Sequence, residues 1–219
     1  MPFALWVILG VFAIASSAAS KTVLLYTANR HGEIKPCSCR DEPIGGIDRM
    51  ARRVKEVRSV GQAVFLDAGE TFFSSPQLNP ARTKSELKRA QAIAKSYKQM
   101  GLAAILPGER DFALGVSVLK TLISTSGAVA VSANLEAEQL DIRTSESVST
   151  AEFKILVTGL SDFDGAKPKA VKTHPPEESL KKVLNTKEAK EADRIVVLSH
   201  LGEKVDRELA KKFPGLFFL

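Results

Sequence analysis

Short apolar segments rich in β-branched residues alternate with longer amphipathic segments along this chain, and this alternation limits the fold more than any other feature. The apolar runs predict strands at 22–26, 63–66, 103–106, 129–132, 153–159 and 194–198. Apolar residues at helical spacing predict helices at 47–60, 83–100, 116–123 and 204–212, and a further helix that opens at 175–178. The polar segment 136–150 is either an excursion or a hairpin. Alternating strands and helices favour an α/β fold of mainly parallel sheets flanked by helices.

Size and charge indicate the class of protein. The 219 residues, 44% of them hydrophobic, are enough for one sizeable core without disulfide staples. The net charge is +6, and the densest basic group is spaced as on a helix. Its members are Arg49, Arg52, Arg53, Lys55 and Arg58. A solvated helix face is the favoured interpretation and an anion-attracting surface the alternative. No aromatic residues interleave with these charges, so we expect no nucleic-acid partner.

The first twenty residues have the composition of a leader. They contain no Asp, Glu, Lys or Arg, residues 3–15 are almost wholly apolar, and small residues fill 16–20. This pattern predicts a signal peptide over 1–20, with a retained N-terminal anchor as the alternative. We therefore expect an exported protein, periplasmic or extracellular, with one domain over 21–219. No stable membrane partner is expected unless the leader is retained.

The chain has two cysteines, Cys37 and Cys39. An exported protein can form disulfides, and a C-x-C bridge closes a very small ring that is easily reduced. A local disulfide, a redox pair, a metal-binding pair and two idle thiols are the open interpretations.

Polar residues follow four of the predicted strands. They are 29–31, 67–70, 109–111 and 199–200. Because ligands in open α/β sheets bind beyond the carboxyl ends of strands, we expect these groups to converge. Carboxylate, amide and imidazole side chains that converge in this way indicate a divalent-metal site, which would activate water and bind phosphoryl oxygens.

Several of these segments resemble the motifs of one family. Residues 26–32 read Tyr-Thr-Ala-Asn-Arg-His-Gly, 45–52 begin Gly-Gly-Ile-Asp-Arg, 66–72 read Leu-Asp-Ala-Gly-Glu-Thr-Phe, and 107–115 begin Pro-Gly-Glu-Arg-Asp-Phe. Segments 132–134 and 196–202 fit in the same order. Together they resemble the 5′-nucleotidase-like branch of the calcineurin-like metallophosphoesterases. The resemblance implies a sandwich of two sheets flanked by helices, with a two-metal site for Mn, Zn or Mg. It also implies a phosphate ester or nucleotide as the ligand.

The resemblance assigns metal-site roles to five residues of this chain. His31 and His200 match family ligands. Asn29 stands where the family has Asp, which removes a negative charge. Glu70 stands at the Asp that bridges the metals, and its extra methylene displaces the carboxylate. Glu109 stands at the Asn ligand.

Two further site residues depart from the family pattern. Arg110 stands at the catalytic His, and a guanidinium neither binds a metal nor gives up a proton. Asp111 stands at the motif Glu. These substitutions predict an exported 5′-nucleotidase-like domain in which phosphoester hydrolysis is weak or lost. The alternative is a non-catalytic anion- or nucleotide-binding protein on the same fold, in which Arg110 holds a phosphate oxygen. A redox or metal-handling protein centred on Cys37 and Cys39 is a third hypothesis.

The C-terminal residues 216–219 read Leu-Phe-Phe-Leu, as at the start of a buried strand. The Gly-His-x-His segment that the resemblance implies does not precede them. We therefore expect the metallophosphoesterase-like domain to be incomplete at its C-terminus.

Overall fold

A computed structural model describes residues 21–37, 44–163, 165 and 167–219. The predicted leader over 1–20 and Cys39 lie outside the described residues. Within the described part of the chain, no helix is both long enough and apolar enough to span a membrane.

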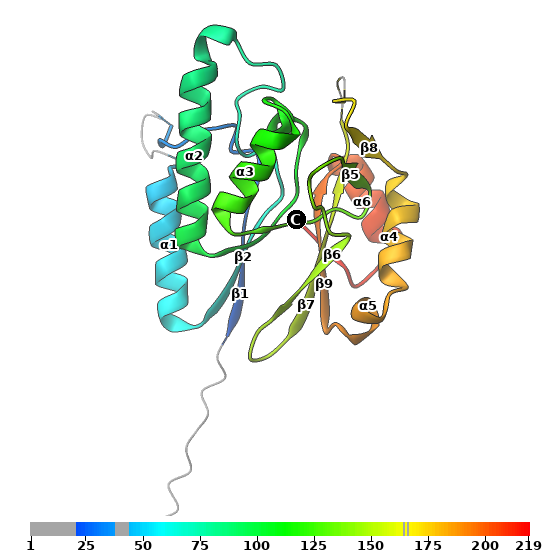
Figure 1. Ribbon diagram of the computed structural model, residues 1–219. Helices are drawn as coiled ribbons and strands as arrows, with labels where there is room; N and C mark the ends of the chain where they lie inside the picture. Colours follow the sequence, from blue (N-terminus) through cyan, green and yellow to red (C-terminus); the bar gives the residue numbers. More distant parts are fainter. Residues whose placement is uncertain (1–20, 38–43, 164, 166) are drawn as a thin grey trace, which may run out of the picture.

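Over the residues that the structure describes, the first sheet consists of four parallel strands. β1 (Thr22–Thr27), β2 (Gln62–Asp67), β3 (Leu102–Ile105) and β4 (Val129–Ala130) lie in this order and are all parallel. Three helices cover its outer face, as Figure 1 shows. They are α1 (Ile47–Val60), α2 (Thr83–Met100) and α3 (Val116–Ser126). The predicted alternation of strands and helices is confirmed here.

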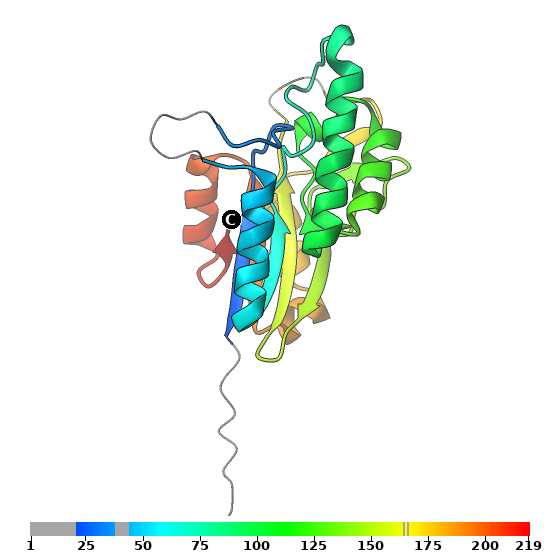
Figure 2. The ribbon, with the colours of Figure 1, turned by 90° about the vertical axis from the view of Figure 1, so that its left-hand side faces the viewer.

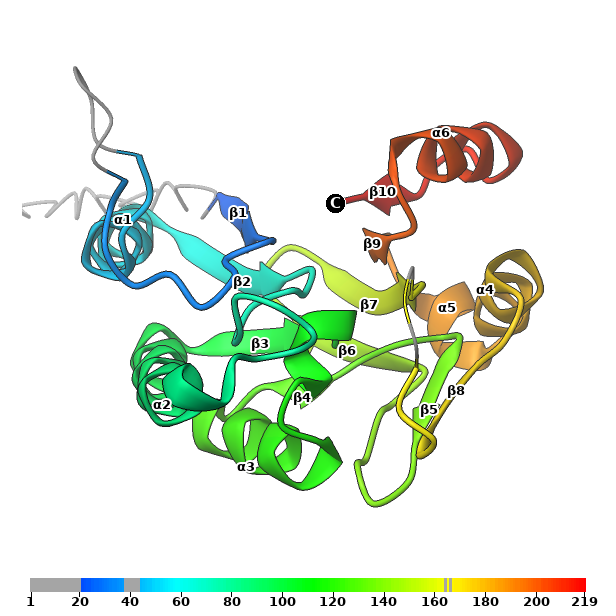
Figure 3. The ribbon, with the colours of Figure 1, turned by 90° about the horizontal axis from the view of Figure 1, so that it is seen from above.

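The second sheet has the order β10-β9-β7-β6. β7 (Lys154–Ser161), β9 (Arg194–His200) and β10 (Phe217–Phe218) are parallel, and β6 (Ser145–Ser149) runs antiparallel to β7. The polar segment therefore ends in a hairpin with β7, one of the two alternatives that the sequence left open. The helices on this side are α4 (Pro176–Leu184), α5 (Lys187–Glu191) and α6 (Glu203–Lys212). Figure 3 shows the two groups of helices on opposite sides of the molecule.

Three short elements were not predicted. β5 (Leu135–Ala137) and β8 (Val171–Thr173) form a two-stranded antiparallel sheet, and α5 is a separate helix of five residues. Each is too short for a hydrophobic period to be visible in the sequence. The remaining short elements are 3₁₀ helices at Pro80–Arg82 and Glu109–Phe112.

The side chains of the strands alternate between two cores. On β2, Val64 and Leu66 point between the sheets, where they share one buried cluster with Val157 and Val196 of the second sheet. Phe65 points the other way, towards the helices of the first sheet. Its ring meets the edge of Tyr97 with centroids 5.6 Å apart. Because successive strand residues point to opposite faces, both faces of the sheet are covered.

This layering confirms the predicted sandwich of two sheets flanked by helices. It also fixes the position of the functional groups. The carboxyl ends of β1, β2 and β3 lie at one edge of the first sheet because these strands are parallel. Figure 1 shows β7 and β9 pointing to the same end of the molecule, where the loops that follow these strands meet.

Candidate functional site

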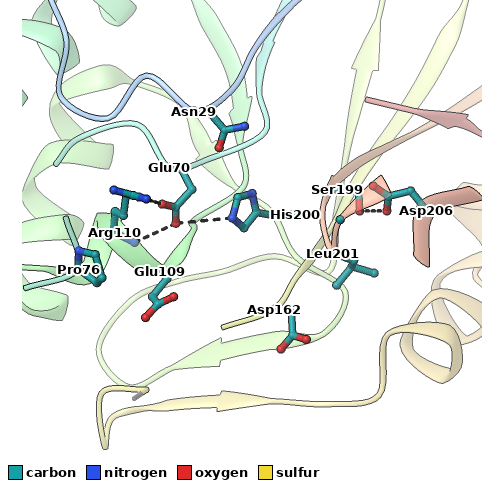
Figure 4. A pocket seen from close by; sticks show the side chains of 11 residues that line it. Asn29, Glu70, Pro76, Glu109, Arg110, Asp162, Ser199, His200, Leu201 and Asp206 are labelled. Atoms are coloured by element: carbon teal, nitrogen blue, oxygen red, sulfur yellow. Dashed lines mark hydrogen bonds and ion pairs between the residues drawn. The ribbon is translucent and has the colours of Figure 1, made fainter. Parts of the chain in front are cut away.

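A cleft of about 440 Å³ lies where these loops meet. Figure 4 shows the side chains that line it. Five of the residues singled out in the sequence are among them: Asn29, Glu70, Glu109, Arg110 and His200. The other lining residues are Pro76, Asp162, Ser199, Leu201, Gly202 and Asp206. The expected convergence of polar strand ends is therefore present in the structure.

The loops after β1 and β2 pair through their backbones at the mouth of the cleft. The amide of Asn29 donates to the carbonyl of Gly69 at 2.9 Å, and the amide of His31 donates to that of Glu70 at 2.8 Å. Asn29, His31 and Glu70 all adopt left-handed backbone conformations, with φ of 52°, 52° and 57°. Non-glycine residues rarely adopt this conformation, and it persists only where surrounding contacts enforce it. The paired loops supply those contacts.

Glu70 is the most deeply placed charged group that lines the cleft, with 4% of its surface exposed. Its Oε1 accepts a hydrogen bond from the backbone amide of Arg110 at 2.9 Å, and its Oε2 lies 2.5 Å from Nε of the same residue. Nε2 of His200 is 3.8 Å from Oε1. The Arg110 guanidinium also donates to the carbonyl oxygen of Ser74. Both oxygens of the Glu70 carboxylate are therefore engaged by one arginine.

Asp111 lies beneath the cleft and is fully buried. Its Oδ1 accepts from the amides of Thr71 and Phe72 at 2.9 and 2.8 Å, and its Oδ2 from those of Gly108 and Glu70 at 2.9 and 3.1 Å. Burial raises the pKa of Asp111 to about 7, although the backbone donors favour the charged form. The three contacts from Glu70, Thr71 and Phe72 join the loop after β2 to the loop after β3, and the contact from Gly108 lies within the second loop.

Comparisons with known proteins find similar structures. No family model matches the sequence, and no curated protein matches it. A 5′-nucleotidase precursor from Thermus thermophilus superposes with a TM-score of 0.70 at 25% identity over 85% of this chain. The NAD nucleotidase of Haemophilus influenzae superposes with a TM-score of 0.68 at 18% sequence identity over 85% of this chain. The calcineurin-like phosphoesterase YfkN of Bacillus subtilis superposes with a TM-score of 0.65 at 18% identity over 88% of this chain. The chain has the fold of the 5′-nucleotidase-like metallophosphoesterases.

The resemblance drawn from the sequence motifs is thereby confirmed, at low sequence identity. The chain spans 38% of the length of the Thermus 5′-nucleotidase precursor and 35% of that of the Haemophilus NAD nucleotidase. It spans 69% of the Bacillus phosphoesterase.

Four of the residues that the resemblance makes metal ligands, Asn29, Glu70, Glu109 and His200, line this cleft together with Arg110. Among the described residues, no group of three or more His, Cys, Asp and Glu side chains is arranged to hold a metal ion. The donor chemistry gives the reason. The carboxylate of Glu70 is directed to Arg110, whose fixed positive charge would repel a cation bound at the same oxygens.

His31 lies behind the lining of the cleft. Partial burial, followed by the nearby charge of Arg110, lowers its pKa. The His200 imidazole points into the cleft, as drawn in Figure 4. The predicted metal roles of Asn29, His31, Glu70, Glu109 and His200 stay predictions.

Sequence reasoning overlooked a buried chain of polar groups under the same loops. The Tyr97 hydroxyl donates to Oδ2 of Asp67 at 2.5 Å, and Nε of Arg30 donates to the Tyr97 hydroxyl at 3.3 Å. Burial raises the pKa of Asp67 to about 6. Asp67 and Arg30 lie in two of the family-like motifs, and this position could have marked them as members of the site. Tyr97 looked only like part of an apolar helix stripe.

Two acidic residues of the cleft were also missed. Asp162 follows β7 directly, and the rule that site residues follow strand ends would have found it. Asp206 lies on α6, where it accepts a hydrogen bond from the Ser199 hydroxyl. Burial raises the pKa of Asp206. Nothing in the local sequence distinguishes Asp206 from an ordinary acidic residue in the first turn of a helix.

Cys37 lies on the loop after β1, away from the residues that line the cleft. Its amide donates to the carbonyl of Ile44 at 2.8 Å, and its Sγ accepts from the Ile44 amide at 3.3 Å. Cys39 lies outside the described residues, so the disulfide or redox pair stays a prediction.

Proposed function

We propose that this protein is a 5′-nucleotidase-like phosphoesterase domain in which hydrolysis of phosphate esters or nucleotides is weak or lost. The fold and the activities of its structural neighbours support the substrate class. The ion pair between Glu70 and Arg110 supports the loss of hydrolysis.

The chemical reason lies in what Arg110 does to the cleft. Its guanidinium keeps its proton at any physiological pH, so it cannot serve as a general acid or base. It also engages the carboxylate that the resemblance makes the bridging ligand. A Mn²⁺, Zn²⁺ or Mg²⁺ ion would have to break this pair and then lie next to a positive charge. Without Glu70, the predicted ligands that remain are Asn29, His31, Glu109 and His200, and Glu109 is the one carboxylate among them.

The alternative predicted from the sequence is anion capture without hydrolysis. Arg110 is the basic group that would hold a phosphate oxygen. The cleft opposes this, because Glu70, Glu109, Asp162 and Asp206 place four carboxyl groups around it. Capture would also require Glu70 to release the guanidinium. This alternative therefore stays a prediction, and the surrounding carboxyl groups would disfavour binding of an anion.

A phosphatase assay on matched variants tests the proposal. The full chain is freed of metal and assayed on nucleoside monophosphates and p-nitrophenyl phosphate with Mn²⁺, Zn²⁺ or Mg²⁺. We expect turnover close to that of buffer for the native protein with every metal. Arg110→His supplies an imidazole and releases Glu70, and it should raise turnover by about tenfold or more. Arg53→His, on the exposed surface of α1, is the matched control and should change nothing.

Native turnover that is lost in His200→Ala would show an active metal site and refute the proposal. An Arg110→His variant no faster than the Arg53→His control would show that Arg110 is not the cause of the loss. Calorimetric titration with a nucleoside monophosphate tests the alternative, which requires heat of binding by the native protein without turnover and loss of that heat in Arg110→Met.

We also propose that the protein is exported by a signal peptide over residues 1–20. Trp6 is the only tryptophan of the chain. A processed protein therefore lacks tryptophan fluorescence, and its mass matches a cleaved chain. Tryptophan emission from protein purified out of the secreting cell would indicate the retained anchor instead.

A further inference from the structure

The helices over the first sheet form a strongly basic surface. α1, α2 and α3 together contain eleven Lys and Arg and three Asp and Glu residues. The helices over the second sheet, α4, α5 and α6, contain eight Lys and Arg and seven Asp and Glu residues. We call the exposed basic residues of the first group the basic layer: Arg49, Arg52, Arg53, Lys55, Arg58, Lys84, Lys88, Lys95, Lys98 and Lys120.

Few acidic groups neutralise the basic layer. Asp48 and Glu56 are the exposed acidic residues of the three helices, and Glu56 pairs with Arg53 at 3.4 Å. The third acidic residue, Glu86, is buried and pairs with Arg89.

On the other side of the molecule the charges are largely paired along the helices. Lys181 pairs with Glu177 at 2.8 Å, and Arg207 with Glu203 at 2.8 Å. The positive field of the described chain is therefore concentrated on one side.

The shape of the basic layer suits a flat partner. Figure 2 shows α1 and α2 side by side, with their axes nearly parallel. The three helices contain one aromatic residue, Tyr97, and it is buried. Proteins that bind single-stranded nucleic acid place aromatic side chains among the basic ones, and the basic layer has none exposed.

The N-terminal segment enters the fold at one end of this layer. The carbonyl of Lys21 accepts a hydrogen bond from the amide of Gln62 at 3.2 Å, just beyond the C-terminal end of α1. Residues 1–20, which precede Lys21, are largely apolar and carry no Asp, Glu, Lys or Arg. In the unprocessed chain an apolar segment thus adjoins clustered Lys and Arg in the sequence, a combination that anionic lipid surfaces attract. After cleavage of the leader the attraction rests on the basic layer alone.

We propose that the basic layer binds an anionic lipid surface. Each Lys or Arg near such a surface adds to the attraction, which extends over roughly a Debye length and weakens with added salt. The cleft takes no part in this contact. The proposal is independent of the phosphoesterase proposal and would survive its failure.

Co-sedimentation with vesicles tests the proposal on the full chain. One set of vesicles is phosphatidylcholine alone, and the other contains phosphatidylglycerol as well. Because residues 1–20 have no charged side chains, the α-amino group of Met1 is their one charge, and they contribute little to the difference between the two sets. The difference in affinity between the two sets therefore reports on the folded surface.

Two variants with the same net charge locate the contact. The layer variant carries Arg49→Glu, Arg52→Glu, Lys88→Glu and Lys95→Glu. The control variant carries Lys182→Glu, Lys190→Glu, Lys204→Glu and Lys211→Glu, all exposed on the opposite helices. We expect the layer variant to lose on the order of a hundredfold in affinity for the anionic vesicles, and the control about threefold or less.

Three results would overturn the proposal. The first is equal affinity of the native chain for both sets of vesicles. The second is an equal loss in the layer and control variants, which would indicate a non-specific effect of net charge. The third is tighter binding to duplex DNA than to the anionic vesicles at the same ionic strength, which would assign the surface to nucleic acid. Circular dichroism of both variants excludes unfolding as the cause of a loss.

Discussion

The cleft and the basic layer both contain charged side chains, and they hold these charges differently. In the cleft, Glu70 is 4% exposed and bound through both oxygens to Arg110. In the basic layer, Arg53 and Glu56 have side chains 70% and 54% exposed and meet at 3.4 Å. The difference teaches that similar ion pairs differ in energetic weight, because desolvation makes a buried charge depend on its partner.

The same difference bears on function. Long, exposed side chains attract a partner over a distance but define no atomic position. Buried, bonded side chains define positions and exclude ligands that do not match them. This contrast underlies the two proposals, that the basic layer recognises a charged surface and that the cleft has lost a specific chemistry. The following predictions test this contrast, from the largest expected effect to the smallest.

The largest effect is expected beneath the cleft. Asp111→Ala removes the acceptor of four buried backbone amides and should lower the free energy of unfolding by about 3–5 kcal/mol. Urea denaturation measures the change. Asp162→Ala, at an exposed position of the cleft, should stay within about 0.5 kcal/mol of the native protein. Equal losses in the two variants would mean that water replaces the Asp111 carboxylate without cost.

A second test breaks the ion pair of the cleft. Arg110→Met leaves Glu70 buried without its guanidinium and should cost about 2 kcal/mol. Adding Glu70→Gln removes the stranded charge, so the double variant should be more stable than Arg110→Met alone. The coupling energy from the full double-mutant cycle should be about 1–3 kcal/mol. A coupling energy near zero would mean that the Glu70–Arg110 pair contributes no more to stability than an exposed surface pair.

The third test concerns pH. Burial raises the pKa of Asp67 to about 6 and that of Asp111 to about 7, both above the ordinary value of 3.8. Between about pH 4 and pH 7 the folded state therefore holds more protons than the unfolded chain, and stability should fall as pH rises through this window. The slope is at most about 1.4 kcal/mol per pH unit for each carboxyl group.

Urea denaturation across this pH range gives the slope, and Asp111→Asn should flatten it. Stability that rises with pH over the same window would mean that the hydrogen-bond donors around the two carboxylates outweigh burial.

The smallest effect is expected in the basic layer. Arg53→Gln removes the exposed pair with Glu56 and should change the free energy of unfolding by less than about 0.5 kcal/mol. Thermal or urea unfolding at low and high salt measures it. A change of several kcal/mol would contradict the contrast between the two regions.

Much of the fold was predictable because its signals are local. The apolar runs located β1, β2, β3, β7 and β9 to within a few residues. Gly101 directly follows the predicted helix 83–100 and caps α2 in the left-handed conformation, with φ of 59°. The short elements β5, β8 and α5 escaped because three to five residues show no periodicity.

The candidate site was predictable in outline only. Parallel strands bring their carboxyl ends to one edge, so the meeting of Asn29, Glu70, Glu109 and His200 followed from the topology. The direction of each side chain did not follow. The left-handed φ of Glu70 carries no sequence signal, since glutamate has no special tolerance for that conformation.

The sequence by itself determined the order of the strands and helices and the polar groups that follow the strands, because periods of two and 3.6 residues are properties of neighbouring positions. Only the tertiary structure decided that Glu70 meets Arg110, forty residues further along the chain, and that Asp111 is buried under both loops. It also decided that the charges of α1, α2 and α3 share one side of the molecule. Each of these outcomes is a distance or an exposure set by packing between distant segments, and no local pattern encodes it.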